Sequence, residues 1–178
     1  MSDITTVILA AGNSTRFKAS KSKLVYPLCG LPIVSHIFNI AKKISGKNIL
    51  VVSNEKNKEE LKLILNTSKL VVQKKQKGTA DAIEQVKKYV KSKNILILFG
   101  DTPLVEVKDI RKLVSKFKKS KAKASLIAFN TLEPHGYGRL LLNNKYVEEI
   151  IEQINLKPEQ KKIKSKVNKS EKKNLQKK

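Results

Sequence analysis

Two hydrophobic patterns alternate along the chain. Short apolar runs of the kind that form buried strands occur at residues 6–10, 48–53, 69–72 and 94–99. Longer stretches, with apolar side chains three and four positions apart as on one helix face, occur at residues 33–44, 55–66, 79–90 and 107–119. Strands and helices in this order predict repeated β-α units, so we expect an α/β fold with a mostly parallel sheet and flanking helices.

The run at residues 94–99, NILILF, is the most continuous apolar segment of the chain. Such a run predicts a central strand that is buried on both faces. It ends at Gly100 and Asp101. Because ligands of parallel sheets bind at the carboxyl ends of the strands, Asp101 is a candidate functional residue.

The C-terminal third has a different pattern. A further strand is expected at residues 124–129, and a hairpin at residues 140–142 and 146–151 with its turn at Asn143-Asn144. From about residue 157 the chain consists mostly of Lys, Asn, Ser, Gln and Glu, a composition too poor in apolar side chains to offset the entropy of ordering. We therefore expect a domain over residues 1–155 and a Lys-rich tail over residues 156–178 that is disordered or partly helical.

The formal net charge is +23, and a field of this size attracts polyanions. The cations are almost all lysines, with arginine only at Arg16, Arg111 and Arg139. Nucleic-acid recognition usually draws on the planar arginine fork, and a proteome-wide lysine bias explains the charge equally well. The tail has no aromatic side chains among its lysines on which bases would stack. Nucleic-acid binding through the tail stays an alternative that the sequence does not favour.

Other features bear on the compartment. The single cysteine, Cys29, excludes an internal disulfide and is consistent with a reducing cytoplasm. No secretory signal is visible at the N-terminus, and no run reaches the roughly 20 apolar residues of a membrane helix. We expect a cytoplasmic protein with Cys29 as a small core residue. His36 and His135 lack metal-ligand spacing and are expected to be structural or surface residues.

The loop after the first strand, residues 9–23, combines small and basic residues. Ala10, Ala11 and Gly12 allow the backbone to approach phosphate oxygens and to present N–H groups to them. The loop matches neither G-x-x-x-x-G-K-[ST] nor G-x-G-x-x-G, which removes the main support for the two commonest phosphate loops. Arg16 and Lys23 would supply charge to neutralise a triphosphate. An ordinary strand-to-helix turn with solvated lysines is the competing interpretation.

The sequence of this loop, LAAGNSTRFKASKSK, resembles the L-A-A-G-x-G-T-R-[MF]-x-S-x-x-P-K signature of the sugar-nucleotide pyrophosphorylases, in the superfamily of MobA-like NTP transferases. Four later segments resemble, in order, the N-terminal uridylyltransferase domain of the bacterial N-acetylglucosamine-1-phosphate uridyltransferases. They are Q-x-x-Q-K-G-T-A from residue 73, F-G-D-T-P-L from 99, G-Y-G-R from 136 and I-E at 151. The likeness covers about residues 4–155, with a weaker echo to Asn168.

The resemblance implies a Rossmann-like nucleotidyltransferase domain, incomplete at its C-terminal side. Its reaction would transfer a uridylyl group from UTP to a sugar 1-phosphate, N-acetylglucosamine 1-phosphate in the family, and release pyrophosphate. It implies Arg16 and Lys23 as the catalytic cations and Asp101 as the ligand of Mg²⁺. The implied nucleotide-binding residues are Leu9, Ala10, Ala11, Gly12, Gln73, Gly78 and Thr79. The implied sugar-binding residues are Gly138, Glu152 and Asn168.

Several alternatives stay open beside this interpretation. Asp101 is also suited to a turn, Thr79 to a helix N-cap, and the glycines around Tyr137 to a plain turn. Ser14 replaces the second glycine of the signature, and Ser22 replaces the proline before Lys23. A truncated copy, a non-catalytic module that binds RNA or another polyanion, and a cytidylyl- or molybdopterin-type transferase are the competing functions. The glutamine motif argues against the last.

Overall fold

The computed structural model describes residues 3–13, 17, 21–66, 69–76, 78–144, 146–161 and 167–168. The chain divides into two compact units, Met1–Lys123 and Ala124–Lys178. Each unit is described by itself.

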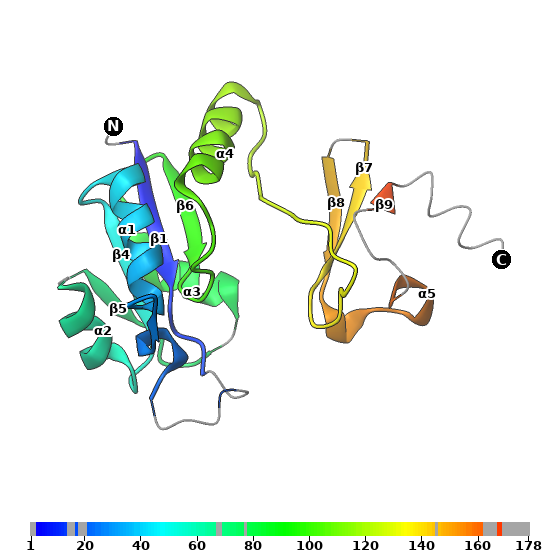
Figure 1. Ribbon diagram of the computed structural model, residues 1–178. Coiled ribbons are helices and arrows are strands. Elements are labelled where there is room, and N and C mark those ends of the chain that lie inside the picture. Colours follow the sequence, from blue (N-terminus) through cyan, green and yellow to red (C-terminus); the bar gives the residue numbers. More distant parts are fainter. Residues whose placement is uncertain are drawn as a thin grey trace. The chain divides into compact units, whose positions relative to one another are not determined.

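Unit 1 contains a parallel sheet in the order β5-β4-β1-β6 (Figure 1). Its strands are β1 (Ile4–Leu9), β4 (Ile49–Ser53), β5 (Leu70–Val72) and β6 (Asn94–Phe99). Val7 of β1 lies opposite Leu50 on one side and Ile97 on the other. The α/β class and the parallel pairing that the sequence predicted are thus confirmed.

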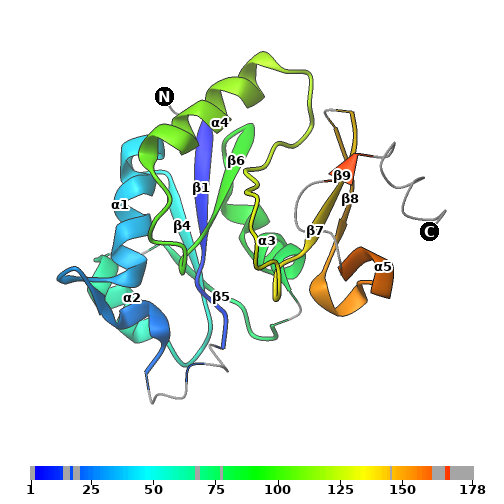
Figure 2. The same cartoon turned by 45° about the vertical axis from the view of Figure 1, so that its right-hand side comes forward.

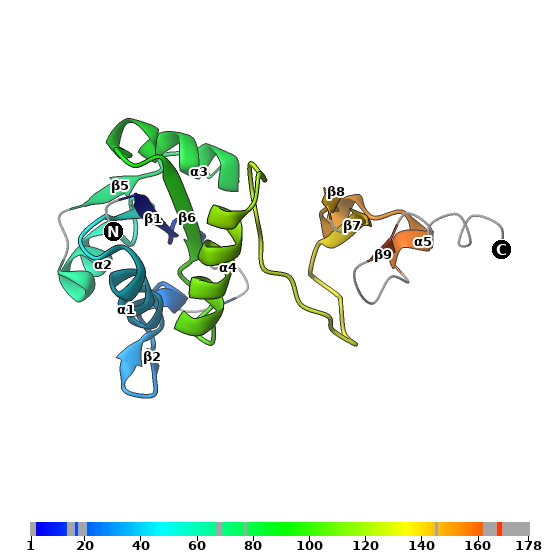
Figure 3. The same ribbon diagram turned by 90° about the horizontal axis from the view of Figure 1, so that it is seen from above.

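Helices cover both faces of this sheet. They are α1 (Ile33–Ser45), α2 (Lys58–Leu65), α3 (Thr79–Val86) and α4 (Val107–Lys119). The helix α3 lies on one face, and α1, α2 and α4 lie on the other (Figure 3). Three short elements link β1 to α1, namely the 3-10 turn η1 (Lys23–Val25) and the strands β2 (Pro27–Leu28) and β3 (Leu31–Pro32). A second 3-10 turn, η2 (Lys87–Tyr89), follows α3.

The core of unit 1 consists of one apolar cluster on each face of the sheet. The larger cluster packs Ile8 of β1 against Ile37 of α1 and Leu61 of α2, all fully buried. The smaller cluster packs Val7 of β1 against Val86 of α3. Since adjacent residues of β1 point to opposite faces, the apolar run from Ile4 to Leu9 serves both clusters, as expected for a parallel strand between two helical layers.

The expectation that residues 94–99 form a central strand buried on both faces was wrong. Within the described part of unit 1, β6 pairs with β1 and ends the sheet (Figure 2). Leu96 and Leu98 pack under α1 and α4, but Ile95, Ile97 and Phe99 are 41%, 37% and 49% exposed. The reason is that α3 packs against β1, β4 and β5, so the outer half of its face of the sheet is left uncovered.

Unit 2 contains the predicted hairpin, formed by β7 (Arg139–Asn143) and β8 (Tyr146–Ile151). The short strand β9 (Val167–Asn168) pairs with β7, and η3 (Gln153–Asn155) and α5 (Pro158–Lys161) follow β8. Leu141, Ile151 and Leu156 form a small buried cluster. The helix α5 and the strand β9 fall within the segment expected to be a disordered or partly helical tail.

Two other expectations were wrong. Residues 124–129 are described without strand structure, because no neighbouring strand among the described residues supplies the hydrogen bonds that an isolated strand lacks. Cys29 is not in the core but exposed in the turn between β2 and β3, with φ of 49°.

Among the described residues, no helix has the length and apolar character that a membrane crossing requires.

Candidate functional site

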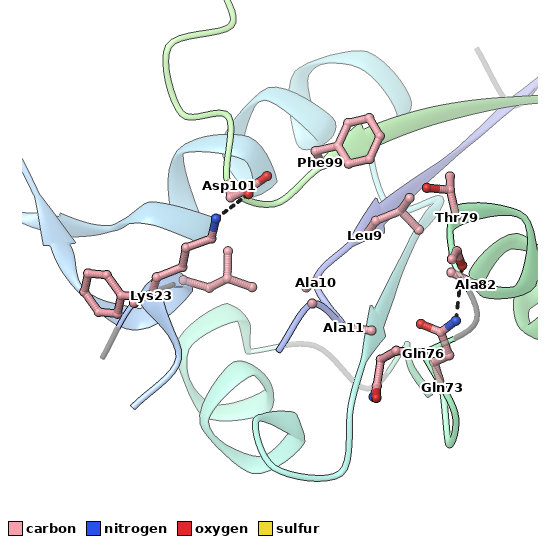
Figure 4. A pocket seen from close by; sticks show the side chains of 14 residues that line it. Leu9, Ala10, Ala11, Lys23, Gln73, Gln76, Thr79, Ala82, Phe99 and Asp101 are labelled. Atoms are coloured by element: carbon pink, nitrogen blue, oxygen red, sulfur yellow. Dashed lines mark hydrogen bonds and ion pairs between the residues drawn. The ribbon is translucent and has the colours of Figure 1, made fainter. Parts of the chain in front are cut away.

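A cavity of about 600 Å³ opens at the carboxyl ends of β1 and β6 and reaches the first turn of α3. Lys23, Gln73 and Asp101 approach it from three different elements (Figure 4). Nine of the residues predicted from the sequence line this cavity: Leu9, Ala10, Ala11, Gly12, Lys23, Gln73, Gly78, Thr79 and Asp101. Arg16 lies outside the described residues. The cavity belongs entirely to unit 1.

Two buried asparagines hold the backbone of the loop after β1. The Nδ2 group of Asn57 donates to the carbonyl of Ala10 at 2.8 Å, and Nδ2 of Asn54 donates to the carbonyl of Ala11 at 3.0 Å. The asparagines also bind each other, since each backbone N–H donates to the other's Oδ1 at 3.0 Å. Both side chains are nearly inaccessible, with Asn54 5% and Asn57 2% exposed.

This arrangement sets the direction of the following peptide groups. In a planar trans peptide the carbonyl of one residue and the N–H of the next point in opposite directions. The N–H groups of Ala11 and Gly12 therefore point away from the asparagines. Within the described part of the chain neither donates to a protein acceptor. The loop thus has two backbone donors available to an anion, held by side chains from the segment between β4 and α2.

We expect Asn57→Ala to lower the free energy of unfolding by about 2–3 kcal/mol, because the buried carbonyl of Ala10 loses its partner. Urea or thermal unfolding measures this loss. Asn39→Ala is the matched control, since Asn39 is exposed on α1 in the same unit and its replacement should change stability by about 0.5 kcal/mol or less. Equal stability of the two variants would contradict the role assigned to Asn57.

Lys23 and Asp101 form an ion pair at the cavity wall. The Nζ of Lys23 lies 2.6 Å from Oδ2 of Asp101, and the two side chains are 35% and 38% exposed. Lys23 begins the turn η1, where Ser22 Oγ accepts a hydrogen bond from the N–H of Leu24 at 3.4 Å. Ser22 has φ of −60°, a value that proline also adopts, so the serine in place of the family's proline keeps the backbone of this turn.

Asp101 is positioned by the glycine before it. The N–H of Gly100 donates to the carbonyl of Leu9 at 2.9 Å, which extends the pairing of β6 with β1 by one residue. A Cβ at position 100 would lie 3.2 Å from the same carbonyl, which is too close for easy accommodation. A residue without a side chain therefore lets the chain turn at the end of β6, close to the end of β1, and places the Asp101 carboxylate at the cavity wall.

The donor set of the cavity fits a Mg²⁺ ion that is bound together with a nucleotide, and not one that is enclosed by protein side chains. The described residues contain no cluster of three or more His, Cys, Asp or Glu side chains that would enclose a metal ion. Mg²⁺ in nucleotide sites is typically held by one or two carboxylates, with phosphate and water oxygens completing the octahedron. Asp101 lines the cavity and has a carboxylate of the kind that would serve as such an oxygen ligand.

Gln73 and Gly78 form the opposite wall. Gln73 is 3% exposed, its N–H donates to the carbonyl of Ser53 at 2.8 Å, and its Nε2 lies 3.3 Å from the carbonyl of Gly78. Gly78 has φ of 103° and ψ of −176°, a conformation that is essentially restricted to glycine. Gly78 takes the N-cap position of α3 and Thr79 is the first helical residue, so the interpretation of Thr79 as the N-cap was wrong.

The predicted sugar-binding residues all lie in unit 2. Gly138 and Glu152 are neighbours, since a Cβ at Gly138 would lie 3.7 Å from Oε2 of Glu152. Asn168 belongs to β9, where it lies opposite Leu142. The guanidinium of Arg139 donates to the carbonyls of Pro134 and Tyr137 and so closes the glycine-rich turn that precedes β7. The sugar-binding roles stay predictions.

The sequence interpretation missed some residues of the site. Asn54 and Asn57 were not singled out, although two asparagines just after an apolar strand are a signal for buried polar contacts at the carboxyl edge of a sheet. The apolar rings of Phe17 and Phe99 also line the cavity. His36 is structural as expected, with Nε2 at 2.8 Å from the carbonyl of Leu28 in the β2–β3 hairpin.

The chain is similar in sequence to known proteins over most of its length. The chain is 41% identical over 164 residues to the bifunctional protein GlmU of Buchnera aphidicola subsp. Schizaphis graminum, covering 91% of this chain and 35% of that protein. It is 39% identical over 168 residues to the bifunctional protein GlmU of Campylobacter fetus, covering 92% of this chain and 37% of that protein. The chain therefore spans about a third of the length of these relatives.

A solved structure supports the fold. A crystal structure from Bacillus anthracis that carries the name glucose-1-phosphate thymidylyltransferase, in complex with sucrose, superposes with a TM-score of 0.75 at 21% identity. The superposition covers 84% of this chain and 64% of that one. At this identity the likeness shows the fold alone.

The family model of the MobA-like NTP transferase domain matches residues 6–168, which include the β1 loop, Lys23, Gln73 and Asp101. The chain is a nucleotidyltransferase domain and belongs to the MobA-like NTP transferase family.

Proposed function

We propose that this chain binds UTP in the cavity of unit 1 and transfers its uridylyl group to a sugar 1-phosphate, N-acetylglucosamine 1-phosphate, with release of pyrophosphate. One observation carries the proposal. A single cavity collects a backbone loop with two outward N–H groups, a lysine, a carboxylate and a buried amide. The N–H groups and the lysine suit a triphosphate, the carboxylate suits a metal ion, and the amide suits a base.

The chemistry requires placement and charge neutralisation. A phosphate oxygen of the sugar 1-phosphate attacks the α-phosphorus, the bond from the α-phosphorus to the bridging oxygen breaks, and pyrophosphate leaves with that oxygen. Lys23 releases Asp101 and donates its ammonium hydrogens to the α-phosphate, whose equatorial oxygens share the negative charge of the transition state. The N–H groups of Ala11 and Gly12 bind the neighbouring phosphate oxygens. Arg16 is proposed to contact the same phosphates.

Asp101 would hold Mg²⁺ through its carboxylate, and the bound ion would neutralise phosphate charge and align the oxygens for in-line displacement. Gln73, together with the backbone of Gly78 and Thr79, would bind the base at the far end of the cavity. Leu9 and Ala10 would pack against the nucleoside. Gly138, Glu152 and Asn168 of unit 2 are proposed to contact the sugar.

A combined binding and turnover assay tests the proposal. The complete chain is expected to bind UTP in calorimetry and to release pyrophosphate when UTP, Mg²⁺ and N-acetylglucosamine 1-phosphate are present together. If the chain shows no UTP binding and no pyrophosphate release, the proposal is wrong. UTP binding without release would support the nucleotide half and contradict the catalytic half.

The assay also separates the competing functions. CTP or molybdopterin as the better substrate would favour a different transferase. Strong RNA binding that weakens steeply with salt and is lost on deletion of residues 157–178 would favour a polyanion-binding module.

A further inference from the structure

The amide of Gln73 has two partners inside the protein. Its Nε2 donates to Oδ2 of Asp81 at 2.6 Å and lies 3.3 Å from the carbonyl of Gly78. The bond to the Asp81 carboxylate is short, as expected for a charged acceptor, and is the stronger of the two. Asp81 itself lies in the first turn of α3 and does not line the cavity.

These partners fix which end of the amide faces the cavity. A carboxylate and a backbone carbonyl are both acceptors, so only the NH₂ end of the amide is able to satisfy them. Both hydrogens of that NH₂ group are then used within the protein. The oxygen remains for a ligand, and Figure 4 shows it on the side of Ala11, away from the nitrogen that carries the dashed hydrogen bond.

We propose that Asp81 is a positioning residue for base selection, which holds the Gln73 amide so that this side chain offers a base an acceptor and no donor. The inference rests on the proposed function, because it concerns the nucleotide that the cavity takes. Asp81 acts through Gln73 and has no contact with the base.

The fixed orientation of the Gln73 amide distinguishes uracil from cytosine. Uracil has one N–H on its pairing edge, at N3, between two carbonyl oxygens. Cytosine has a lone pair at N3, so the same approach places acceptor against acceptor. An amide that was free to rotate would offer its NH₂ group to cytosine N3 equally well. The fixed amide therefore favours uracil, and the preference depends on the carboxylate that fixes it.

Asp81→Asn removes the charge and supplies an NH₂ group of its own, which permits Gln73 to turn its oxygen toward α3. We expect the ratio of UTP to CTP affinity, measured by calorimetry on the complete chain, to fall about tenfold or more in Asp81→Asn. Glu84→Gln is the matched control. It makes the same charge change on the same helix at an exposed residue that pairs with Lys87, so it should leave the ratio unchanged.

A structural role of Asp81 has a different signature. Loss of a carboxylate from the first turn of α3 weakens the helix and would lower the affinity for both nucleotides equally, with no change in their ratio. A second variant tests whether Asp81 acts through Gln73. In the Gln73→Ala background, Asp81→Asn is expected to leave the ratio unchanged, because the amide that it positions is absent.

The outcomes separate the inference from the function on which it rests. If the wild-type chain prefers UTP and Asp81→Asn keeps that preference in full, the inference is wrong while the proposed function stands. A wild-type preference for CTP also overturns it. If the wild-type chain binds neither nucleotide, the proposed function fails and the inference fails with it.

Discussion

Lys23→Ala is expected to lower the rate of pyrophosphate release by about a thousandfold, the scale that follows the loss of one preorganised charge contact in a transition state. Among the described residues, Lys23 is the one cationic side chain that lines the cavity. No other described lysine is in a position to replace it. UTP affinity should fall by a smaller factor, about tenfold, because a contact that accelerates transfer is stronger in the transition state than in the bound substrate. Single-turnover rates and calorimetry measure the two effects separately.

Two variants make this result specific. Lys21→Ala removes the same charge two residues away, at a side chain that does not line the cavity, and should retain nearly full activity. Lys23→Arg keeps the charge but replaces a compact ammonium by a planar fork and should recover only part of the rate. Equal losses in Lys21→Ala and Lys23→Ala would show that general positive charge, and not the position of Lys23, sustains the reaction.

Most of the fold was predictable because each element carries its own periodic signal. The helix α4 was predicted at its observed bounds, since Ile110 and its neighbours follow a single apolar face on an otherwise basic helix. The strand β4 was also predicted to within one residue, because it is buried along its whole length and reads as an unbroken apolar run. Local pattern is sufficient where an element has one apolar face against the core, as in α4, or is buried along its whole length, as in β4.

The positions of strands within the sheet were less predictable. An apolar run indicates that a strand forms, but its neighbours are determined by contacts far away in the sequence. The run at residues 94–99 has the composition of an inner strand, yet β6 ends the described sheet. Residues 124–129 have similar composition and form no strand, because backbone pairing requires a partner that the local pattern does not specify.

The candidate site divides in the same way. The aspartate after β6 was predicted from the rule that functional residues gather at the carboxyl ends of parallel strands. The loop after β1 was predicted from its small and basic residues, and Gln73 from the family resemblance. The asparagine pair and the Lys23–Asp101 ion pair did not follow from the sequence. Each joins segments more than 40 residues apart, and no periodicity records such contacts.

Asp101→Ala is expected to have opposite effects on binding and on catalysis. Loss of the carboxylate that would hold Mg²⁺ should lower pyrophosphate release by about a thousandfold even at high metal concentration. Metal-free UTP, by contrast, should bind as well as in the wild type or up to about fivefold more tightly, because Lys23 no longer has to leave an ion pair worth up to about 1 kcal/mol. Calorimetry in the presence of a chelator measures this second effect.

The variant Asp109→Ala provides the control, since it removes an exposed carboxylate from α4 outside the cavity and should change neither quantity. The double variant Lys23→Ala/Asp101→Ala should bind metal-free UTP as weakly as Lys23→Ala alone, because the gain in Asp101→Ala depends on the freed ammonium. If Asp101→Ala instead weakens metal-free binding, the carboxylate orients Lys23 toward the phosphates and does not compete with them. The gain or loss of affinity without metal therefore determines whether the observed ion pair is the resting state of the site or part of its working geometry.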